Sequence, residues 1–250
     1  MTDRPIIFNA AMIRALLDDR KTQTRRVLKS QPASQGFSGR DETWSWPEPV
    51  LDDDGMSLMT SDQIRDFGMH IGMAKHQIGD RLWVRETWRP FFPSVDPWNI
   101  AVSYDADKSV KHWDWASDAD FGDWNTPKAA NTGNVPSIHM PRWASRLTLI
   151  VTDVRVQRLQ EISEADAVAE GAAGYAYETS IGEGYGSGFC CSHGQDLSHR
   201  PNEQMFDTAK ESFNDLWNFI YGPESWDDNP WVSATTFTVH RCNIDQMEAA

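Results

Sequence analysis

Apolar and polar positions follow regular periods in several segments of the chain. A short apolar run at residues 5–9 predicts a first strand. Apolar residues then recur at helical spacing after Asn9, a suitable N-cap, and predict a helix; they are Met12, Ile13, Leu16 and Leu17. Residues 22–27 alternate and are rich in β-forming types, which predicts a strand or an extended turn. The basic segment 20–26 therefore follows directly after the first helix.

The middle of the chain contains further strand patterns. Gly79 and Asp80 predict a turn, and the strand after it places Leu82, Val84 and Glu86 on one face. Two later segments, residues 137–140 and 147–159, also predict strands, and the second alternates over its whole length.

The last third of the chain predicts two helices and a closing strand. Ser163 is a suitable N-cap for residues 163–170, with Asp166 three residues later as a variant of the capping box. Residues 206–221 have an apolar face at helical spacing. Residues 231–241 predict the final strand.

Polar segments separate these elements and predict long irregular insertions at 30–77, 89–136 and 171–205. No internal repeat or sharp change of composition divides the chain, so we expect one domain over residues 1–250. Strands interleaved with a few short helices, without a βαβ rhythm, predict an α+β fold: a small mixed sheet or barrel that carries insertions.

Composition and charge narrow the function classes. The net charge is −14, which disfavours nonspecific binding to long nucleic acids. Charge is unevenly distributed, however: residues 1–30 carry seven basic against three acidic side chains, and residues 40–66 carry two basic against eight acidic. The basic segment can therefore bind a phosphate-bearing ligand although the protein as a whole is acidic.

Cysteine usage and hydropathy suggest the compartment. Three cysteines form no disulfide framework, the N-terminus lacks the pattern of a signal peptide, and no apolar run reaches membrane-spanning length. We therefore expect a cytoplasmic protein without a membrane partner. Cys190, Cys191, His193 and His199 match no zinc-site spacing, so we expect neither a metal nor another cofactor.

The ordered set of these segments resembles the ASCH family of the PUA-like superfold, in particular its larger phage and prophage members. The resemblance covers about 5–28, 78–88, 137–171 and 206–241. Its most specific element is the sequence DRKTQTRR after the first helix, in which Asp19 replaces the more usual glycine. The resemblance implies a small mixed PUA-like β-barrel with peripheral helices and a cleft that binds RNA, a nucleotide or a nucleoside.

The resemblance also implies candidate catalytic residues. One bacterial branch of the family consists of amidohydrolases that remove the acetyl group from N4-acetylcytidine through a Lys, a Thr and a Glu. The matching positions here are Lys21, Thr24 and, by spacing along the second predicted helix, Glu170. Arg20, Arg25 and Arg26 surround them as candidate substrate-binding groups.

This chemistry sets a geometric condition. An amide carbonyl needs a nucleophile, a base that activates it and an acid for the leaving amine. We assign these roles to Thr24, Lys21 and Glu170. Lys21 and Thr24 point in opposite directions along a regular strand, so the mechanism requires a turn or bulge between them.

Plainer interpretations remain open for the same residues. The basic segment offsets the helix dipole, Thr24 is an ordinary strand residue, and Glu170 is a solvated helix carboxylate.

Further substrate-binding candidates lie elsewhere in the chain. Arg85 and Glu86 either face the cleft or form a cross-strand ion pair. His139, Arg142 and Trp143 either stack on a base and contact phosphate or form a packed Trp beside a surface Arg.

Three functions therefore compete. The first is an amidohydrolase acting on a modified nucleoside, nucleotide or base. The second is a noncatalytic RNA- or nucleotide-binding module that uses the same cleft. The third is a phage interaction protein whose acidic, Trp-rich insertions bind a protein partner.

Overall fold

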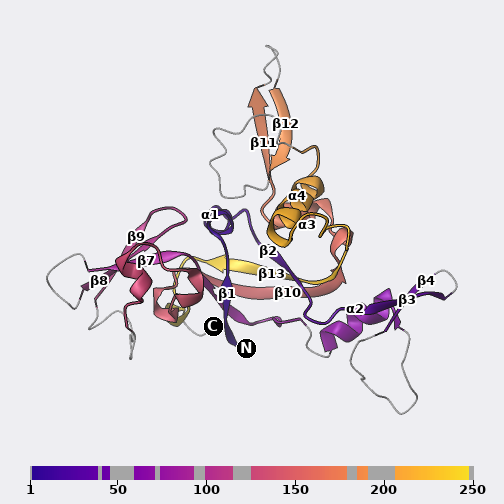
Figure 1. The fold of residues 1–250 in the computed structure, drawn as a ribbon, viewed down its shortest axis with the longest axis horizontal. Helices are drawn as coiled ribbons and strands as arrows, with labels where there is room; N and C mark the ends of the chain where they lie inside the picture. Colours follow the sequence, from indigo (N-terminus) through magenta and orange to yellow (C-terminus); the bar gives the residue numbers. More distant parts are fainter. Residues whose placement is uncertain are drawn as a thin grey trace.

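A five-stranded sheet forms the centre of the molecule (Figure 1). The structure is a computed structural model that describes residues 2–38, 41–45, 59–70, 74–92, 99–114, 125–178, 185–190 and 206–247. The strands lie in the order β1 (Asp3–Ile7), β6 (Arg81–Arg85), β10 (Thr148–Arg158), β13 (Trp231–His240) and β2 (Gln23–Val27). β1 runs parallel to β6, and the other neighbours are antiparallel.

The protein therefore has the predicted α+β fold. Among the strands that the structure describes, β1 and β2 are the two edges of the sheet, and no hydrogen-bonded ladder joins them. A side chain connects the edges instead: the Arg26 guanidinium on β2 donates to the Ile7 carbonyl on β1, 2.8 Å away. Arg26 thus links the two strands that a closed barrel would pair.

Two of the three predicted helices begin where the sequence predicts them, and the last begins at Ala209, three residues after its predicted start. Asn9 caps α1 (Ala10–Leu17) and Ser163 caps α3 (Glu164–Ala169). Thr208 and Glu211 form a capping box at the start of α4 (Ala209–Tyr221). In Figure 1, α3 and α4 lie together above β2 and β13.

The two faces of the sheet pack against different elements. On the inner face, Leu82 of β6 and Leu149 of β10 pack with Phe237 of β13 and with Ile13 and Leu16 of α1. On the outer face, Val232 of β13 packs with Phe213 and Trp217 of α4. Because side chains alternate along a strand, β13 contributes to both cores.

The predicted irregular insertions contain regular structure, so that part of the prediction is wrong. Residues 30–77 include β3 (Ala33–Ser38), β4 (Asp41–Ser45), β5 (Met59–Thr60) and α2 (Ser61–His70). Residues 89–136 include most of β7 (Trp88–Phe91) together with β8 (Asn99–Tyr104) and β9 (Val110–Asp114), and residues 171–205 include β11 (Ala173–Glu178) and β12 (Tyr185–Cys190). Their strands are short and pair with near neighbours in sequence, so polar turns hide the alternation.

The strand predicted over residues 137–140 is also wrong. Two short 3-10 helices occupy this region, η2 (Ser137–His139) after Pro136 and η3 (Arg142–Ala144) after Pro141. Proline has a fixed φ and no backbone N–H, and therefore favours such a turn over a sheet ladder.

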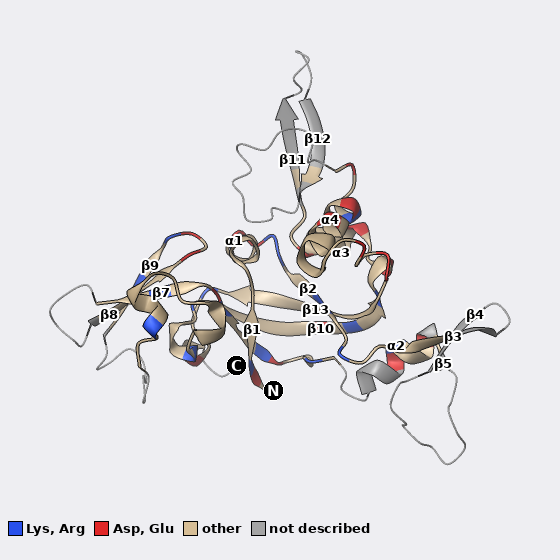
Figure 2. Ribbon diagram, in the orientation of Figure 1, with Lys and Arg blue, Asp and Glu red and all other residues tan. Residues whose placement is uncertain are grey.

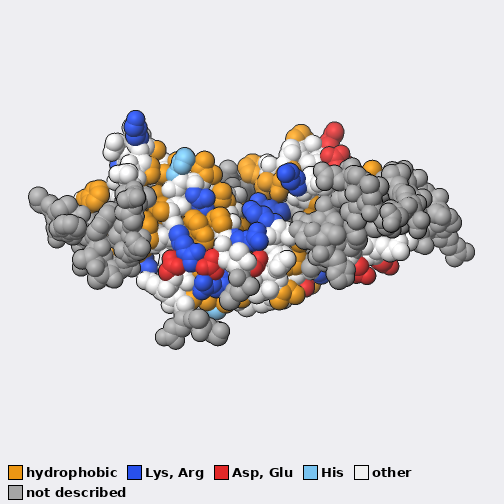
Figure 3. Space-filling model, turned by 90° about the horizontal axis from the view of Figure 1, so that it is seen from below, with side chains coloured by type: hydrophobic (Ala, Val, Ile, Leu, Met, Phe, Trp, Pro, Cys, Tyr) orange, Lys and Arg blue, Asp and Glu red, His pale blue; other side chains and the backbone are white. Residues whose placement is uncertain are grey.

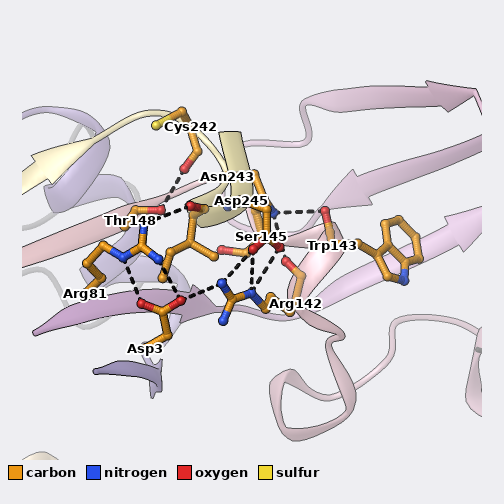
Figure 4. Close-up of polar contacts among 10 residues, drawn as sticks. Asp3, Arg81, Arg142, Trp143, Ser145, Thr148, Cys242, Asn243 and Asp245 are labelled. Atoms are coloured by element: carbon orange, nitrogen blue, oxygen red, sulfur yellow. Dashed lines mark hydrogen bonds and ion pairs between the residues drawn. The ribbon is translucent and has the colours of Figure 1, made fainter. Parts of the chain in front are cut away.

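A polar network fastens the C-terminal segment to the start of the chain (Figure 4). Asp3 on β1 pairs with Arg81 on β6 at 2.8 Å and with Arg142 at 2.6 Å. Arg142 also pairs with Asp245 in the 3-10 helix η7 (Ile244–Gln246), again at 2.6 Å. In this network the Arg81 hydrogen bond holds the pKa of Asp3 below its usual range, with Arg142 acting in the same direction against partial burial.

Within the described part of the chain, no helix has the length and apolar character needed to cross a membrane.

Candidate functional site

A tight turn leads from α1 into β2 and begins the candidate site. The N–H groups of Arg20 and Lys21 both donate to the Ala15 carbonyl, at 2.9 and 3.0 Å. Asp19 adopts a left-handed conformation with a φ of 56°. Glycine adopts this conformation without a steric cost, so Asp19 occupies a position that favours glycine.

Lys21 and Glu170 meet at the end of this turn. The Lys21 ammonium lies 2.7 Å from Glu170 Oε2 and also donates to the Glu170 backbone carbonyl at 2.8 Å. Both residues are buried, with exposed fractions of 1% and 5%. The structure thus brings together two predicted catalytic residues from distant segments, and the interpretation of Glu170 as a solvated carboxylate is wrong.

Arg25 completes a buried charge cluster around Glu170. Its guanidinium lies 3.0 Å from Glu170 Oε1 and 3.1 Å from Asp166 Oδ2. Gln23 donates to Asp166 and accepts from Arg25. Lys21, Gln23 and Arg25 alternate along the chain and reach the same face of α3. We call these three residues with Asp166 and Glu170 the α3 cluster.

Asp166 has a different role from the one predicted. Its backbone N–H donates to the Ser163 hydroxyl, as a capping motif requires, but its carboxylate accepts from Gln23 and Arg155 instead of the N-cap backbone. Burial acts to raise the pKa of Asp166, but hydrogen bonding to Arg155 and the Arg155 and Arg25 charges outweigh burial and lower it.

Gly171 allows the backbone to approach closely behind this cluster. Its φ of 108° is unfavourable for other residues, and an added Cβ would lie 3.4 Å from Ala15 and 3.7 Å from Lys21. A small pocket opens beside Glu170 and Gly171, between α1 and α4. Its other lining residues are Asn9, Ala11, Met12, Ala15 and Leu216.

Thr24 lies on the opposite face of β2 from Gln23 and Arg25. It is buried and pairs with Thr235 of β13. No hydrogen bond within the described part of the chain joins Thr24 to Lys21 or Glu170. Lys21 precedes the strand, and its ammonium lies 5.9 Å from the centre of the inner-face Phe8 ring. The turn lies at Asp18 and Asp19, before Lys21, and no turn separates Lys21 from Thr24. The geometric condition set by the mechanism is therefore not met, and Thr24 lies outside the α3 cluster.

The other two arginines of the basic segment lie apart from the α3 cluster. Figure 2 shows the turn between α1 and β2 as a basic stretch. Arg20 pairs with Asp18 at 2.8 Å. Arg26 donates to Ile7 and lies 5.8 Å from the Phe8 ring centre, so it faces the inner side of the sheet.

Arg85 and Glu86 take part in structural contacts. Glu86 is buried, and both its carboxylate oxygens accept from Arg146 at 2.8 Å. Burial raises the pKa of Glu86, although the hydrogen bonds from Arg146 oppose the shift. Arg85 donates to the carbonyls of Ile138 and Met140. The ion-pair interpretation of Glu86 is correct in kind, with Arg146 as the partner.

His139, Arg142 and Trp143 form no common binding surface. His139 is exposed, and Arg142 belongs to the network with Asp3 and Asp245. Trp143 packs edge to face against Trp88 and Trp113, so its ring is not available to stack on a base. The predicted base-stacking role of Trp143 is therefore wrong.

The acidic insertions are only partly described. Trp113 from the 89–136 insertion is buried in the cluster around Trp88 and Trp143. Trp98, Trp115 and Trp124 lie outside the described residues, as do Cys191, His193 and His199. Within the described residues, no group of three or more His, Cys, Asp or Glu side chains forms a metal site.

Sequence reasoning missed two members of the α3 cluster, Gln23 and Asp166. A usable signal existed for Asp166, because it lies four residues before Glu170 and hence on the same helix face. Sequence reasoning also missed His76, a buried residue of the inner face. Its isolated position in a polar segment gave no such signal.

No family model matches the chain, and no curated protein and no solved structure matches it either.

Proposed function

We propose that this protein binds a cytidine-type ligand beside the α3 cluster and hydrolyses an acyl amide on its exocyclic amine. The buried ion pair between Lys21 and Glu170 carries the proposal. The ASCH resemblance implies that both residues are catalytic. The Lys21 ammonium lies 2.7 Å from Glu170 Oε2, although 149 positions separate the two residues in the sequence. A small pocket lies beside Glu170.

The pair is suited to moving a proton. Lys21 transfers a proton to Glu170 and becomes a neutral amine, which accepts a proton of the attacking water as the oxygen bonds to the acyl carbon. Glu170 then gives its proton to the cytosine nitrogen as the carbon–nitrogen bond breaks. Water is the attacking nucleophile in this proposal, because Thr24 lies on the other face of β2 from the α3 cluster.

A second candidate is a binding module without catalysis. The observation that favours it is the saturation of the α3 cluster: Glu170 accepts from both Lys21 and Arg25, and Thr24 lies on the other face of β2. In this case the cluster is a rigid support, and ligand contacts come from nearby groups.

Turnover of N4-acetylcytidine, followed by chromatography, tests the first candidate. We expect the wild-type chain to release cytidine and acetate, and Lys21→Ala or Glu170→Gln to lose at least about 100-fold in kcat/KM, as for loss of an acid–base group. Lys29→Ala is the control, because Lys29 is an exposed cation just after β2. Circular dichroism establishes that each variant is folded.

The outcomes separate the two candidates. Binding of N4-acetylcytidine without turnover by the wild-type chain favours the noncatalytic module. Turnover that survives in a folded Lys21→Ala variant contradicts the assigned chemistry. If the wild-type chain neither binds nor hydrolyses the nucleoside, both candidates fail.

A further inference from the structure

We propose that a polar strip on the inner face of the sheet binds a phosphate group, so that the ligand is a nucleotide or an RNA nucleotide rather than a free nucleoside. The inner strip consists of Thr24 and Arg26 of β2, Ser233 and Thr235 of β13, and His76. The base would occupy the site of the proposed function, and this part of the inference rests on that function. The phosphate site itself does not.

Strand register places four of these side chains on one face. Thr24 is directly opposite Thr235 in the β2–β13 ladder, and Arg26 is opposite Ser233. Directly opposed residues point to the same side of a sheet. Phe237, two residues after Thr235, belongs to the inner core, which identifies this side as the inner face.

Two buried polar atoms of the inner strip have no hydrogen-bond partner within the described part of the chain. They are Nε2 of His76 and the hydroxyl of Ser233. His76 is only 4% exposed, and its Nδ1 lies 3.5 Å from the Thr235 hydroxyl. An unsatisfied buried polar group costs about 1–3 kcal/mol, so such groups are normally satisfied by water or by a ligand.

The charges around His76 favour an anion. Burial, followed by the charge of Lys75, lowers the pKa of His76 to about 4, with Arg4 and Arg26 acting in the same direction and Asp80 against them. The charges of three cations therefore act on the imidazole against that of one carboxylate, Asp80, which pairs with Arg4 at 3.6 Å. Asp80 itself accepts hydrogen bonds from the N–H groups of Thr2 and Gln77. A neutral His76 that accepts from Thr235 presents Nε2–H as a donor.

Phosphate matches these donors better than a carboxylate does. A guanidinium has five N–H donors in a planar fork, and the Ile7 carbonyl accepts from one nitrogen of Arg26. Arg26, His76 and the two threonine hydroxyls would supply several donors to one tetrahedral anion. Figure 3 shows basic side chains together with acidic ones near the middle of the underside of the molecule.

Phe8 connects the inner strip to the α3 cluster. Its ring centre lies 5.9 Å from the Lys21 ammonium and 5.8 Å from the Arg26 guanidinium, so these two cations are at most about 12 Å apart. Thr24 lies between Lys21 and Arg26 in sequence and belongs to the inner strip. One nucleotide can therefore place its base near Lys21 and its phosphate near Arg26.

Equilibrium titration followed by tryptophan fluorescence tests the inference at low ionic strength. The probes are cytidine, cytidine 5′-monophosphate, inorganic phosphate and a short single-stranded RNA. We expect the wild-type chain to bind the monophosphate at least about tenfold more tightly than cytidine. Inorganic phosphate should compete with the monophosphate, and monophosphate binding should weaken as the salt concentration rises. If the RNA binds more tightly than the monophosphate, the phosphate belongs to an RNA chain. If the monophosphate binds more tightly, the phosphate belongs to a free nucleotide.

The variants are Lys75→Ala and His76→Gln, with Lys29→Ala as the control. Lys75 is exposed, so its replacement removes charge without disturbing the core. We expect a three- to tenfold loss of monophosphate affinity in both variants, no change for cytidine, and no change in the control. Circular dichroism establishes the fold of His76→Gln.

Equal wild-type affinity for cytidine and its monophosphate overturns the inference. So does monophosphate binding that is unchanged in both variants. Phosphate-dependent binding without hydrolysis of an acylated cytidine supports the inner strip while the enzymatic proposal fails. Hydrolysis of an acylated cytidine without any preference for phosphate supports the enzymatic proposal and overturns the inner strip.

Discussion

At the scale of single residues, the buried polar groups divide into a satisfied set and an unsatisfied one. Glu170 accepts from Lys21 and Arg25, and each of these cations is almost completely buried. Such an ion pair compensates for the loss of hydration, but its net contribution to stability is small. His76 has no comparable partner on Nε2.

His76 should make the protein less stable as the pH falls from 7 to 5. Its pKa is lowered to about 4 in the folded protein, whereas an unfolded chain has a value near 6.5. The unfolded state therefore binds a proton in this range and the folded state does not, so stability is present above about pH 6.5 and is lost toward pH 4. We expect His76 to account for about 2 kcal/mol of the loss in unfolding free energy between pH 7 and pH 5, measured by urea denaturation.

His76→Gln should remove this part of the pH dependence. His112→Gln is the matched control, because His112 is exposed in β9 and should leave the profile as it is in the wild type. Parallel pH profiles for wild type and His76→Gln would contradict the prediction.

At the scale of elements, the end of α1 determines how β2 enters the site. Asp19 is left-handed, with a φ of 56°, while Asp18 has a φ of −90°. Asp19 therefore carries backbone strain that glycine would relieve, and its exposed ion pair with Arg241 contributes little.

We expect Asp19→Gly to raise the unfolding free energy by about 0.5–1 kcal/mol, measured by chemical denaturation. Asp18→Gly is the control, and it should lower stability because glycine only adds conformational freedom there. A similar loss in both variants would mean that the left-handed turn carries no strain.

The same turn shows what an element contributes to the site. Lys21 reaches Glu170 because its N–H and that of Arg20 are both fixed to the Ala15 carbonyl. β2 then begins with Gln23 and follows ordinary alternation, so Thr24 has to face the inner side. The position of Thr24 is a consequence of strand geometry.

At the scale of the whole molecule, Asn243 joins the C-terminal segment to the central sheet. Its buried amide donates to the carbonyls of Arg142, Trp143 and Ser145 at 2.8, 3.1 and 2.8 Å (Figure 4). Since Ser145 in turn donates to the Val84 carbonyl, this contact connects the segment to β6.

We expect Asn243→Ala to lower the unfolding free energy by about 2–3 kcal/mol, because buried carbonyls lose their donors. Urea denaturation measures the change. Asn134→Ala is the control: this exposed Asn bonds Asp105, and its removal should cost less than about 0.5 kcal/mol. A comparable loss in both variants would show that the Asn243 contacts do not join the segment to the sheet.

Local patterns in the sequence determined much of the main sheet and its helices. The caps Asn9 and Ser163, the alternating strand β10 and the apolar face of α4 are recognisable because each depends on a period within a few residues. Short strands such as β8 were missed, because their alternation covers too few positions between polar turns. Pro136 and Pro141 overrode an apparent strand pattern for a similarly local reason.

The sequence alone also singled out Lys21 and Glu170, through a resemblance and a spacing. Only the tertiary structure decided that they form a pair, that Arg25 and Asp166 join them, and that Trp143 is core. These contacts depend on which strands become neighbours, and periodicity carries no information about strand order. The face of Thr24, the Arg146 partner of Glu86 and the buried His76 were decided in the same way, because burial is a property of the assembled sheet and helices.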